Sequence, residues 1–353
     1  MLESALAAIL FPNSNNYFSP IRGISGPDGH SHWRLNPSLK RLNPSLKEGD
    51  IMTSDFDRRE LIALAGLGGL GVVFGSAIAP QASAQVYGGS TTAAPEDFFF
   101  VQLSDTHWGF KDDAINPDAA GTFKKVVAAI NALSRQPDFI VFTGDMTHTT
   151  DDPKERRARM AAMRDMIGAL KVKDVRFAPG DHDAQKDRGE AYQEFFGKLN
   201  YTFDHKGYHF IVLDNTSDPD QKLGDAQIAW LAADLRQLAA GTPVVVLTHR
   251  PLFELYRPWG WWTPDGDKAL DLLKPFKPTV FYGHIHHEHH TTAVGAVHHA
   301  TTSLMIPLYP AGTRPDRTMV PWDPKRPYLG MGWRTVSARG KGTAWDIQQP
   351  GVS

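Results

Sequence analysis

Short runs of apolar residues alternate along the chain with longer stretches in which apolar positions recur at helical spacing. The short runs are typical of buried strands and lie at residues 97–103, 138–142, 175–178, 201–203, 208–213, 244–247 and 279–282. The longer stretches have apolar residues three and four apart and lie at residues 118–135, 153–170, 189–199, 224–240 and 268–273. Beyond residue 290 the pattern predicts mainly strands and loops, through 291–302 and 333–345.

This alternation predicts an α/β fold with a largely parallel or mixed sheet, because helices commonly connect parallel strands. No shift in composition marks a second domain after residue 85, so residues 85–353 are predicted to form a single domain. The aromatic run Phe98–Phe100 is predicted to lie in the core. The Pro-rich stretch 307–327 is predicted to wrap the surface.

Residues 1–51 follow a different pattern from the rest of the chain. They are rich in Asn, Ser, Pro and Gly, and a seven-residue repeat occupies 34–40 and again 41–47. Two short copies are not enough for a solenoid. We therefore interpret 1–51 as a disordered leader or as an extension that is not native, with translation starting at Met52.

Residues 52–84 have the order of a twin-arginine signal peptide. Arg58-Arg59 precede an apolar stretch at 61–79, and Ala82-Ser83-Ala84 fits a small-residue cleavage site. We therefore predict export by the Tat machinery, a periplasmic or secreted bacterial protein, and no stable membrane anchor after cleavage. An uncleaved anchor, for which the apolar stretch is just long enough, and a buried helix are the alternatives.

Composition narrows the chemistry that this chain can perform. Its 353 residues include no cysteine, which excludes disulfides, thiol nucleophiles and cysteine-ligated metals. A formal net charge of −2 leaves no basic excess of the kind that binds nucleic acid non-specifically. Because cysteine is lacking, any metal must be held by His, Asp, Glu or Asn. The 15 histidines are unevenly spread along the chain.

Ligand-type residues follow one predicted strand after another. They are Asp105 and His107, Asp145, Asp181 and His182, His249, and finally His284 and His286. Because α/β sheets bind ligands at the carboxyl ends of their strands, we expect five strand ends to converge on one site. Carboxylates and imidazoles gathered in this way are typical of a site for two transition-metal ions.

The order and spacing of these residues resemble the calcineurin-like metallophosphoesterases over about residues 98–290. The motifs are Asp105-x-His107, Gly144-Asp145, Gly180-Asp181-His182-Asp183, His249 and Gly283-His284-x-His286. The resemblance implies a two-sheet β-sandwich flanked by helices, in four layers α/β/β/α. It also implies two divalent or trivalent metal ions, of iron, manganese or zinc, and a metal-bound hydroxide that attacks a phosphoester.

The resemblance implies a role for each position. The first metal would be held by Asp105, His107 and His286, and the second by His249 and His284 with Asp181 beside them. Asp145 would bridge both metals. His182 would contact the phosphate and protonate the leaving group, held in place by a hydrogen bond to Asp183.

Asp181 departs from the family, which usually has Asn at this position. A carboxylate adds a negative charge, so we expect tighter metal binding and lower Lewis acidity. The same charge repels a phosphate dianion, which favours diesters and other less charged substrates.

Several residues near these motifs have two interpretations. His148 is either a further ligand or substrate contact, or a loop residue bonded locally. Arg250 either touches phosphate or forms a surface ion pair. The aromatic group Trp259, Trp261 and Trp262 is either a lid over an aromatic substrate or packing for the sheet edge. A dense tract of histidines, expected to be structural or pocket-lining rather than a separate metal-binding strip, comprises His287, His289, His290, His298 and His299.

The sequence therefore predicts a phosphodiesterase or phosphomonoesterase that acts on a small phosphorylated substrate. Two alternatives stay open, a non-catalytic metal-binding scaffold of the same fold and a metal-dependent hydrolase of another bond class. The second usually has His-x-His near its first strand, where this chain has Asp105-x-His107. The scaffold is disfavoured because every inferred ligand position holds a competent residue.

Overall fold

The computed structural model describes residues 97–338 and 345–353. The chain divides into two units, Met1–Gln85 and Val86–Ser353, and the described residues belong to the second. The predicted extension (1–51) and signal peptide (52–84) lie outside the described residues. Within the described ranges, no helix combines the length and the apolar character needed to cross a membrane.

The first sheet has five strands in the order β11-β10-β1-β2-β3. Their bounds are β1 Phe98–Leu103, β2 Phe139–Thr143, β3 Val175–Ala178, β10 Arg334–Ala338 and β11 Trp345–Gln348. The strands β1, β2 and β3 are parallel, and β10 and β11 are added antiparallel at one edge. The sheet is therefore mixed, as the sequence predicts.

The second sheet has six strands in the order β4-β5-β6-β7-β9-β8. Their bounds are β4 Tyr201–His205, β5 Tyr208–Val212, β6 Val244–Leu247, β7 Thr279–Tyr282, β8 His289–Ala293 and β9 Ala296–Ala300. A parallel centre, β5-β6-β7-β9, is closed at each edge by an antiparallel hairpin partner. The two strands predicted at 201–203 and 208–213 pair as a hairpin, with its turn at Lys206-Gly207.

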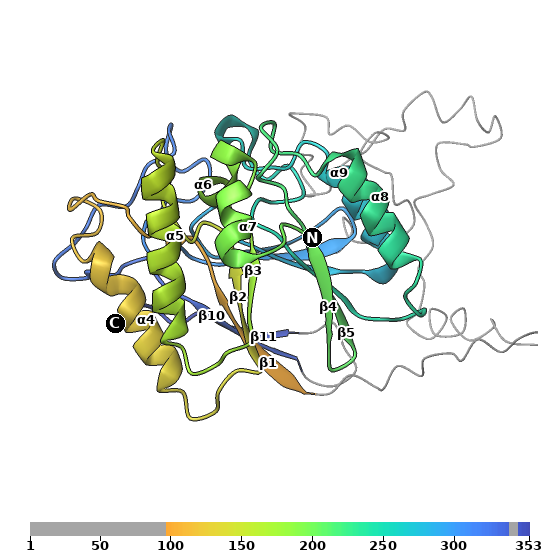
Figure 1. Cartoon of the computed structure of the whole chain (residues 1–353), viewed down its shortest axis with the longest axis horizontal. Coiled ribbons are helices and arrows are strands. Elements are labelled where there is room, and N and C mark those ends of the chain that lie inside the picture. The colour runs from red at the N-terminus through yellow and green to blue at the C-terminus, as the bar shows by residue number, and fades with distance from the viewer. Residues whose placement is uncertain (1–96, 339–344) are drawn as a thin grey trace, which may run out of the picture. The chain divides into compact units, whose positions relative to one another are not determined.

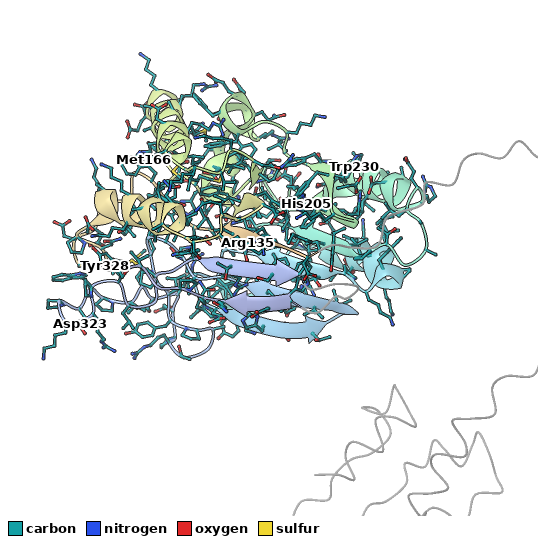
Figure 2. All side chains as sticks on the ribbon, turned by 90° about the horizontal axis from the view of Figure 1, so that it is seen from below. Arg135, Met166, His205, Trp230, Asp323 and Tyr328 are labelled. Atoms are coloured by element: carbon teal, nitrogen blue, oxygen red, sulfur yellow. The ribbon has the colours of Figure 1, made fainter. Side chains whose placement is uncertain are left out.

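Helices cover the outer face of each sheet. They are α4 Ala119–Asn131, α5 Pro153–Gly168, α6 Asp181–Ala184, α7 Glu190–Phe196, α8 Gly224–Leu235 and α9 Gly266–Leu273, with 3₁₀ turns η2 Gln185–Asp187, η3 Arg257–Trp259 and η4 Lys274–Phe276. Figure 1 shows α4, α5 and α7 on one side and α8 and α9 on the other. Figure 2 likewise separates Met166 of α5 from Trp230 of α8.

The alternation of side chains along β1 explains the layers. Phe98 and Phe100 point into a core between the two sheets, together with Phe210 and Phe281 of the second sheet. The opposite face of the strand, which carries Val101, packs against the helices on the outside of the first sheet. A third core lies between the second sheet and α8 and α9. The four-layer α/β/β/α sandwich is therefore confirmed. Phe98 and Phe100 contribute to its core, but the prediction is wrong for Phe99, which is only partly buried and lies under the Arg135 guanidinium.

Helix ends differ from the predicted ends where local capping decides them. The side chain of Asp152 accepts a hydrogen bond from the Lys154 amide, and Pro153 occupies the first turn, so α5 begins where the sequence predicts. It ends at Gly168 rather than 170. The stretch 307–327 contains no helix or strand and is largely exposed over its second half, in keeping with the predicted surface course.

Candidate metal centre

The predicted ligand residues follow β1, β2, β3, β6 and β7, whose carboxyl ends meet at one edge of the two sheets. Backbone hydrogen bonds tie these strand ends together. The Asp105 amide donates to the Gly144 carbonyl, and the Gly283 amide donates to the His249 carbonyl. The convergence of strand ends that the sequence predicts is therefore found.

The backbone at this edge is strained in a way that the sequence pattern does not reveal. Five of the predicted ligand residues have left-handed φ values, namely Asp105 (54°), His107 (44°), Asp145 (53°), His284 (66°) and His286 (58°). Such conformations cost about 1 kcal/mol or more for each residue that is not glycine, and they cluster at functional sites. The strain turns these side chains inward, and the surrounding contacts maintain it.

Glycines beside the ligands allow the close approach of backbone and side chains. A Cβ atom at Gly283 would lie 1.9 Å from the Ser104 hydroxyl oxygen. A Cβ atom at Gly144, where φ is +97°, would lie 2.4 Å from His249 Nδ1. Packing therefore requires glycine in both the Gly-His and the Gly-Asp motif, and at Gly144 the positive φ requires it as well.

One group of ligand atoms combines four buried residues, Asp105, His107, Asp145 and His286. Their ligand atoms all lie within 4.8 Å of one another. His286 Nε2 is 3.1 Å from Asp105 Oδ1 and 3.1 Å from His107 Nε2. These are the residues predicted for the first metal, together with the predicted bridging carboxylate.

A second group combines Asp181, His249 and His284. Asp181 Oδ1 is 3.0 Å from His249 Nε2 and 3.0 Å from His284 Nδ1. These are the residues predicted for the second metal. The structure brings all seven predicted ligands together, and their binding of ions stays a prediction.

Asp145 lies between the two groups. Its Oδ2 atom is 3.6 Å from His107 Nε2 and 3.3 Å from His249 Nε2. Its Oδ1 atom accepts a hydrogen bond of 2.9 Å from the His182 amide. One oxygen thus faces ligands of both groups, which is the arrangement that a bridging carboxylate needs.

Hydrogen bonds behind the imidazoles fix which nitrogen faces the centre. His249 Nδ1 donates to the Thr143 carbonyl at 2.8 Å, and His286 Nδ1 donates to the Ile306 carbonyl. In the neutral rings their Nε2 atoms carry no hydrogen and present lone pairs to the centre. His284 is reversed, with Nδ1 inward and Nε2 3.0 Å from Arg250 Nη1.

Charge in this buried edge favours cations. Burial alone would raise the pKa values of Asp105 and Asp181, but neighbouring imidazoles hold both below the usual value, so both are carboxylates. Burial would lower the pKa of His249, but the Asp145 and Asp181 carboxylates raise it well above the usual range. Burial lowers the pKa of His107. Three carboxylates and four imidazoles in one buried edge fit divalent transition metals, which displace protons when they bind.

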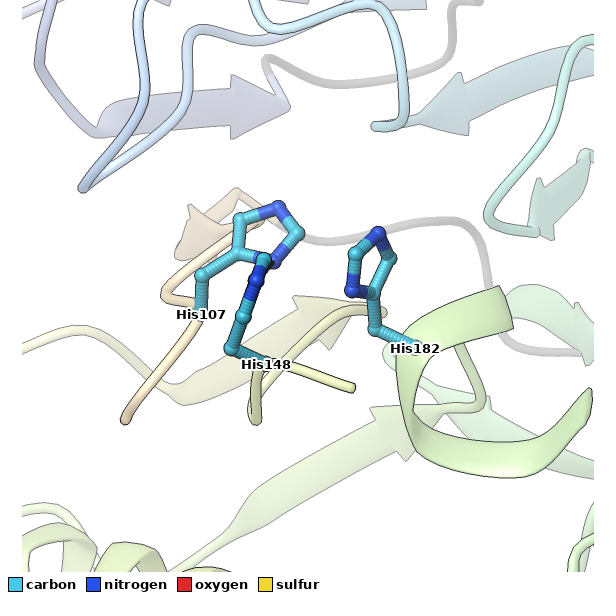
Figure 3. Close-up of side chains that lie close together, drawn as sticks. All are labelled: His107, His148 and His182. Carbon is cyan, nitrogen blue, oxygen red and sulfur yellow. Dashed lines mark hydrogen bonds between the residues drawn. The ribbon is translucent and has the colours of Figure 1, made fainter. Parts of the chain in front are cut away.

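His182 lies on α6, directly after β3, beside His107 and His148. Figure 3 shows these three imidazoles gathered together. The Thr149 amide donates a 3.1 Å hydrogen bond to His182 Nδ1. Neutral His182 therefore carries its proton on Nε2. The residue that fixes this tautomer, Thr149, escaped the sequence reasoning because it acts through its backbone.

The predicted hydrogen bond between Asp183 and His182 is wrong. The carboxylate of Asp183 instead accepts hydrogen bonds from the amides of Met146, Thr147 and Gly180 and from the Thr147 hydroxyl. The turn into α6 directs neighbouring side chains in different directions, so Asp183 anchors the loop after β2. Burial and the charge of Asp145 raise its pKa to about 7.

His148 and Arg250 occupy different surroundings. His148 Nδ1 is 3.4 Å from His107 Nδ1, and burial lowers the pKa of His148 to about 4. His148 therefore lies at the centre's rim, where both predicted roles, ligand and substrate contact, stay open. The predicted surface ion pair of Arg250 is wrong, because this residue is 4% exposed and its guanidinium donates to the Gly260 and Trp262 carbonyls.

The tryptophans after His249 do not act as a single group. Trp261 is fully buried against Tyr282 and Ile285, while Trp259 is partly buried against the same cluster. The Arg257 guanidinium lies 4.0 Å from the centre of the Trp262 ring. Trp261 is therefore packing rather than part of a lid, as the second interpretation expects.

A cleft of about 820 Å³ is lined in part by the segment that directly follows His107. Its lining includes Trp108, Lys111 and Asn116, and Arg159 of α5. The Arg159 guanidinium also donates to the carbonyls of His148 and Thr149. The cleft thus shares one wall with the loop that positions His182.

Known proteins resemble this chain over the part that holds the candidate metal centre. The family model described as "Calcineurin-like phosphoesterase" matches residues 100–288. The "Probable cyclic nucleotide phosphodiesterase" of Rhodococcus erythropolis is 30% identical over 166 residues, which cover 44% of this chain and 52% of the relative. The "Serine/threonine-protein phosphatase CPPED1" of Danio rerio is 28% identical over 225 residues, which cover 54% of this chain and 70% of that protein.

A solved dimetal phosphatase from Danio rerio superposes with a TM-score of 0.48 at 15% identity, covering 73% of this chain and all of that one. The chain spans about half the length of the first relative above. The family match covers more than half of the chain and includes every predicted ligand motif. The chain belongs to the calcineurin-like phosphoesterase family.

Proposed function

We propose that this protein is a metal-dependent hydrolase of phosphoesters that favours diesters. The observation that carries the proposal is Asp145 Oδ2, which lies between two groups of buried ligand atoms. Membership of the phosphoesterase family supports it. Relatives named as phosphodiesterases and as phosphatases both match the chain.

The centre is suited to two transition-metal ions of iron, manganese or zinc. Asp105, His107 and His286 would hold one, His249, His284 and Asp181 the other, and Asp145 both. When bound, such a pair lowers the pKa of water and neutralises charge on phosphoryl oxygens. The negative charge of these carboxylates repels substrates that carry two negative charges, and the Asp181 carboxylate adds to that repulsion. Diesters, which carry less negative charge, are therefore the favoured class.

His182 is the residue that we assign to proton transfer. Its Nδ1 accepts the Thr149 amide hydrogen, so the proton sits on Nε2. Its side chain offers a nitrogen within 4.8 Å of ligand atoms of Asp145 and Asp181. From there the neutral ring can donate an Nε2 hydrogen bond to a phosphoryl oxygen. To protonate the leaving alkoxide, the ring first takes a second proton from solvent on Nδ1, which replaces the hydrogen bond from the Thr149 amide.

Export through the Tat machinery to the periplasm or the medium is part of the proposal, and it rests on residues 52–84 of the sequence. Folded export suits a protein that binds its metals inside the cell before transport. Expression in a bacterium with and without a functional Tat system tests this idea. We expect a mature amino terminus at Gln85, and accumulation of the precursor when the system is missing. Export that continues unchanged would contradict it.

The test of activity uses the purified protein, its metal content and a panel of mono- and diesters. We expect two metal ions per chain and turnover of bis(p-nitrophenyl) phosphate. Asp145→Ala should reduce kcat/KM by about a thousandfold, because bound metals contribute several kcal/mol to such reactions. Asp225→Ala, a change at an exposed carboxylate, is the control and should leave turnover unchanged.

Two outcomes would contradict the proposal. Tight binding of two metals without turnover of any phosphoester would favour the non-catalytic scaffold. Full activity of Asp145→Ala would show that the centre described above is not the site of hydrolysis.

A further inference from the structure

The hairpin of β8 and β9 carries a second group of histidines, at the edge of the six-stranded sheet. His290 and His299 face each other directly in the antiparallel register. Their Nδ1 atoms are 2.6 Å apart and their ring centroids 4.9 Å apart. Neither residue is among the ligands of the centre described above.

Glu288 orients one of these imidazoles. His290 Nε2 donates to Glu288 Oε1 at 2.8 Å. In neutral His290, Nδ1 then has no hydrogen and presents a lone pair to His299. A carboxylate that accepts the outer ring hydrogen in this way is the usual partner of a metal-binding histidine, because it fixes the tautomer and makes the ligand more basic.

His299 supplies a second nitrogen that is neutral. Its imidazole is partly buried, beside the Phe281 ring. Burial, with the nearby charges of His290 and Arg334, lowers its pKa to about 3. In the state in which both imidazoles are neutral, Nδ1 atoms this close share one hydrogen between them. A cation bound to both nitrogens would replace that hydrogen after a small separation of the rings, because each metal–nitrogen bond is about 2.0–2.1 Å.

We propose that His290 and His299 form a second, peripheral binding site for a divalent transition cation that prefers imidazole, such as Zn²⁺ or Cu²⁺. Glu288 is its positioning residue, and water completes the coordination. Arg334 Nη2 lies 3.9 Å from Glu288 Oε1. With two protein nitrogens, this site is weaker than the centre at the strand ends. A cation bound there would connect His290 on the edge strand β8 to His299 on β9.

The test is a titration of the purified protein, already loaded at its main centre, with Cu²⁺ alone in a buffer that does not chelate. Cu²⁺ is the best probe because it binds nitrogen ligands most tightly among these ions. We expect one extra copper per chain, with nitrogen couplings from two imidazoles in electron paramagnetic resonance spectra. Activity of the main centre, followed in parallel, should not change as this copper binds.

Variants separate the site from other histidines. His290→Ala and His299→Ala should each remove the extra copper and its nitrogen couplings. Glu288→Ala should weaken binding by about tenfold, and Glu288→Gln, which keeps an acceptor, should weaken it less. The matched control is His289→Ala, because His289 points to the other face of the strand, toward the Tyr282 hydroxyl.

The side chain of His290 is 41% exposed, so its replacement should not unfold the protein, and circular dichroism checks this. Copper binding that persists with the same spectrum in His290→Ala and His299→Ala would overturn the proposal. So would a wild-type protein that takes up copper only by displacing metal from the main centre.

Discussion

Four histidines line the centre at the strand ends, and four others lie on the β8–β9 hairpin, yet the two regions differ in backbone and charge. In the centre, His107, His284 and His286 have left-handed φ values. On the hairpin, His289, His290, His298 and His299 sit in ordinary antiparallel pairs. The strained backbone is therefore a property of the centre and not of histidine-rich sequence.

The carboxylates differ even more. Asp105 and Asp145 are 0% and 2% exposed beside the centre's imidazoles, whereas the hairpin pair has Glu288, which is 42% exposed. Buried carboxylates are costly unless they are paired or bound to metal. The comparison teaches that the number of histidines is a poor guide to chemistry, and that buried carboxylates beside strained ligands are a better one.

The largest effect that we expect sharpens the centre's side of the comparison. His182→Asn should lower kcat for diesters with alkyl leaving groups by about a thousandfold, because a positioned general acid contributes on that scale. For p-nitrophenyl esters, whose leaving group needs no proton, the loss should be much smaller. Rates across a series of leaving groups provide the measurement. An equal loss for all leaving groups would contradict a proton-transfer role.

The next effect concerns the hairpin and the stability of the fold. Burial lowers the pKa of His298 to about 4, below the unfolded value of about 6.5. The folded state therefore binds fewer protons between these pH values. The stability contribution is complete above pH 6.5 and is lost as the pH falls toward 4, by about 3 kcal/mol.

Denaturant unfolding from pH 4 to 7 measures this contribution. His298→Asn should unfold more easily at pH 7, and its free energy of unfolding should fall less steeply with acid than that of the wild type. The difference in slope isolates His298 from other titrating histidines. An equal dependence of the unfolding free energy on pH in the two proteins would contradict the effect.

The smallest effect distinguishes charge from ligand type within the centre. Asp181→Asn removes one negative charge while keeping an oxygen ligand, so the ratio of monoester to diester hydrolysis should rise about fivefold. That factor corresponds to about 1 kcal/mol of charge repulsion at a few ångströms in water. Steady-state kcat/KM values for matched mono- and diesters measure it, with Asp225→Asn as control. An unchanged ratio would contradict the role given to Asp181.

Much of the fold could be predicted because strand and helix periods are local. The order of the longer helices and of the strands they connect follows from the apolar pattern, and the four-layer class is what the family resemblance implies. Ends of helices were predicted too long, as for 118–135, where α4 spans Ala119–Asn131. The last turns of a helix depend on capping and tertiary packing, which a periodic pattern does not contain.

Within the candidate site, the sequence by itself determined which residue types follow the strand ends, and hence the seven predicted ligands. The partners of those residues came only with the tertiary structure. His249 donates to the carbonyl of Thr143, which is 106 positions away along the chain. Asp183 bonds to the loop after β2 and not to the His182 side chain. Tautomers, left-handed φ values and the reversed orientation of His284 all depend on such distant contacts. A sequence motif specifies which groups are present, whereas only the packing of the two sheets decides which atom of each group faces the centre.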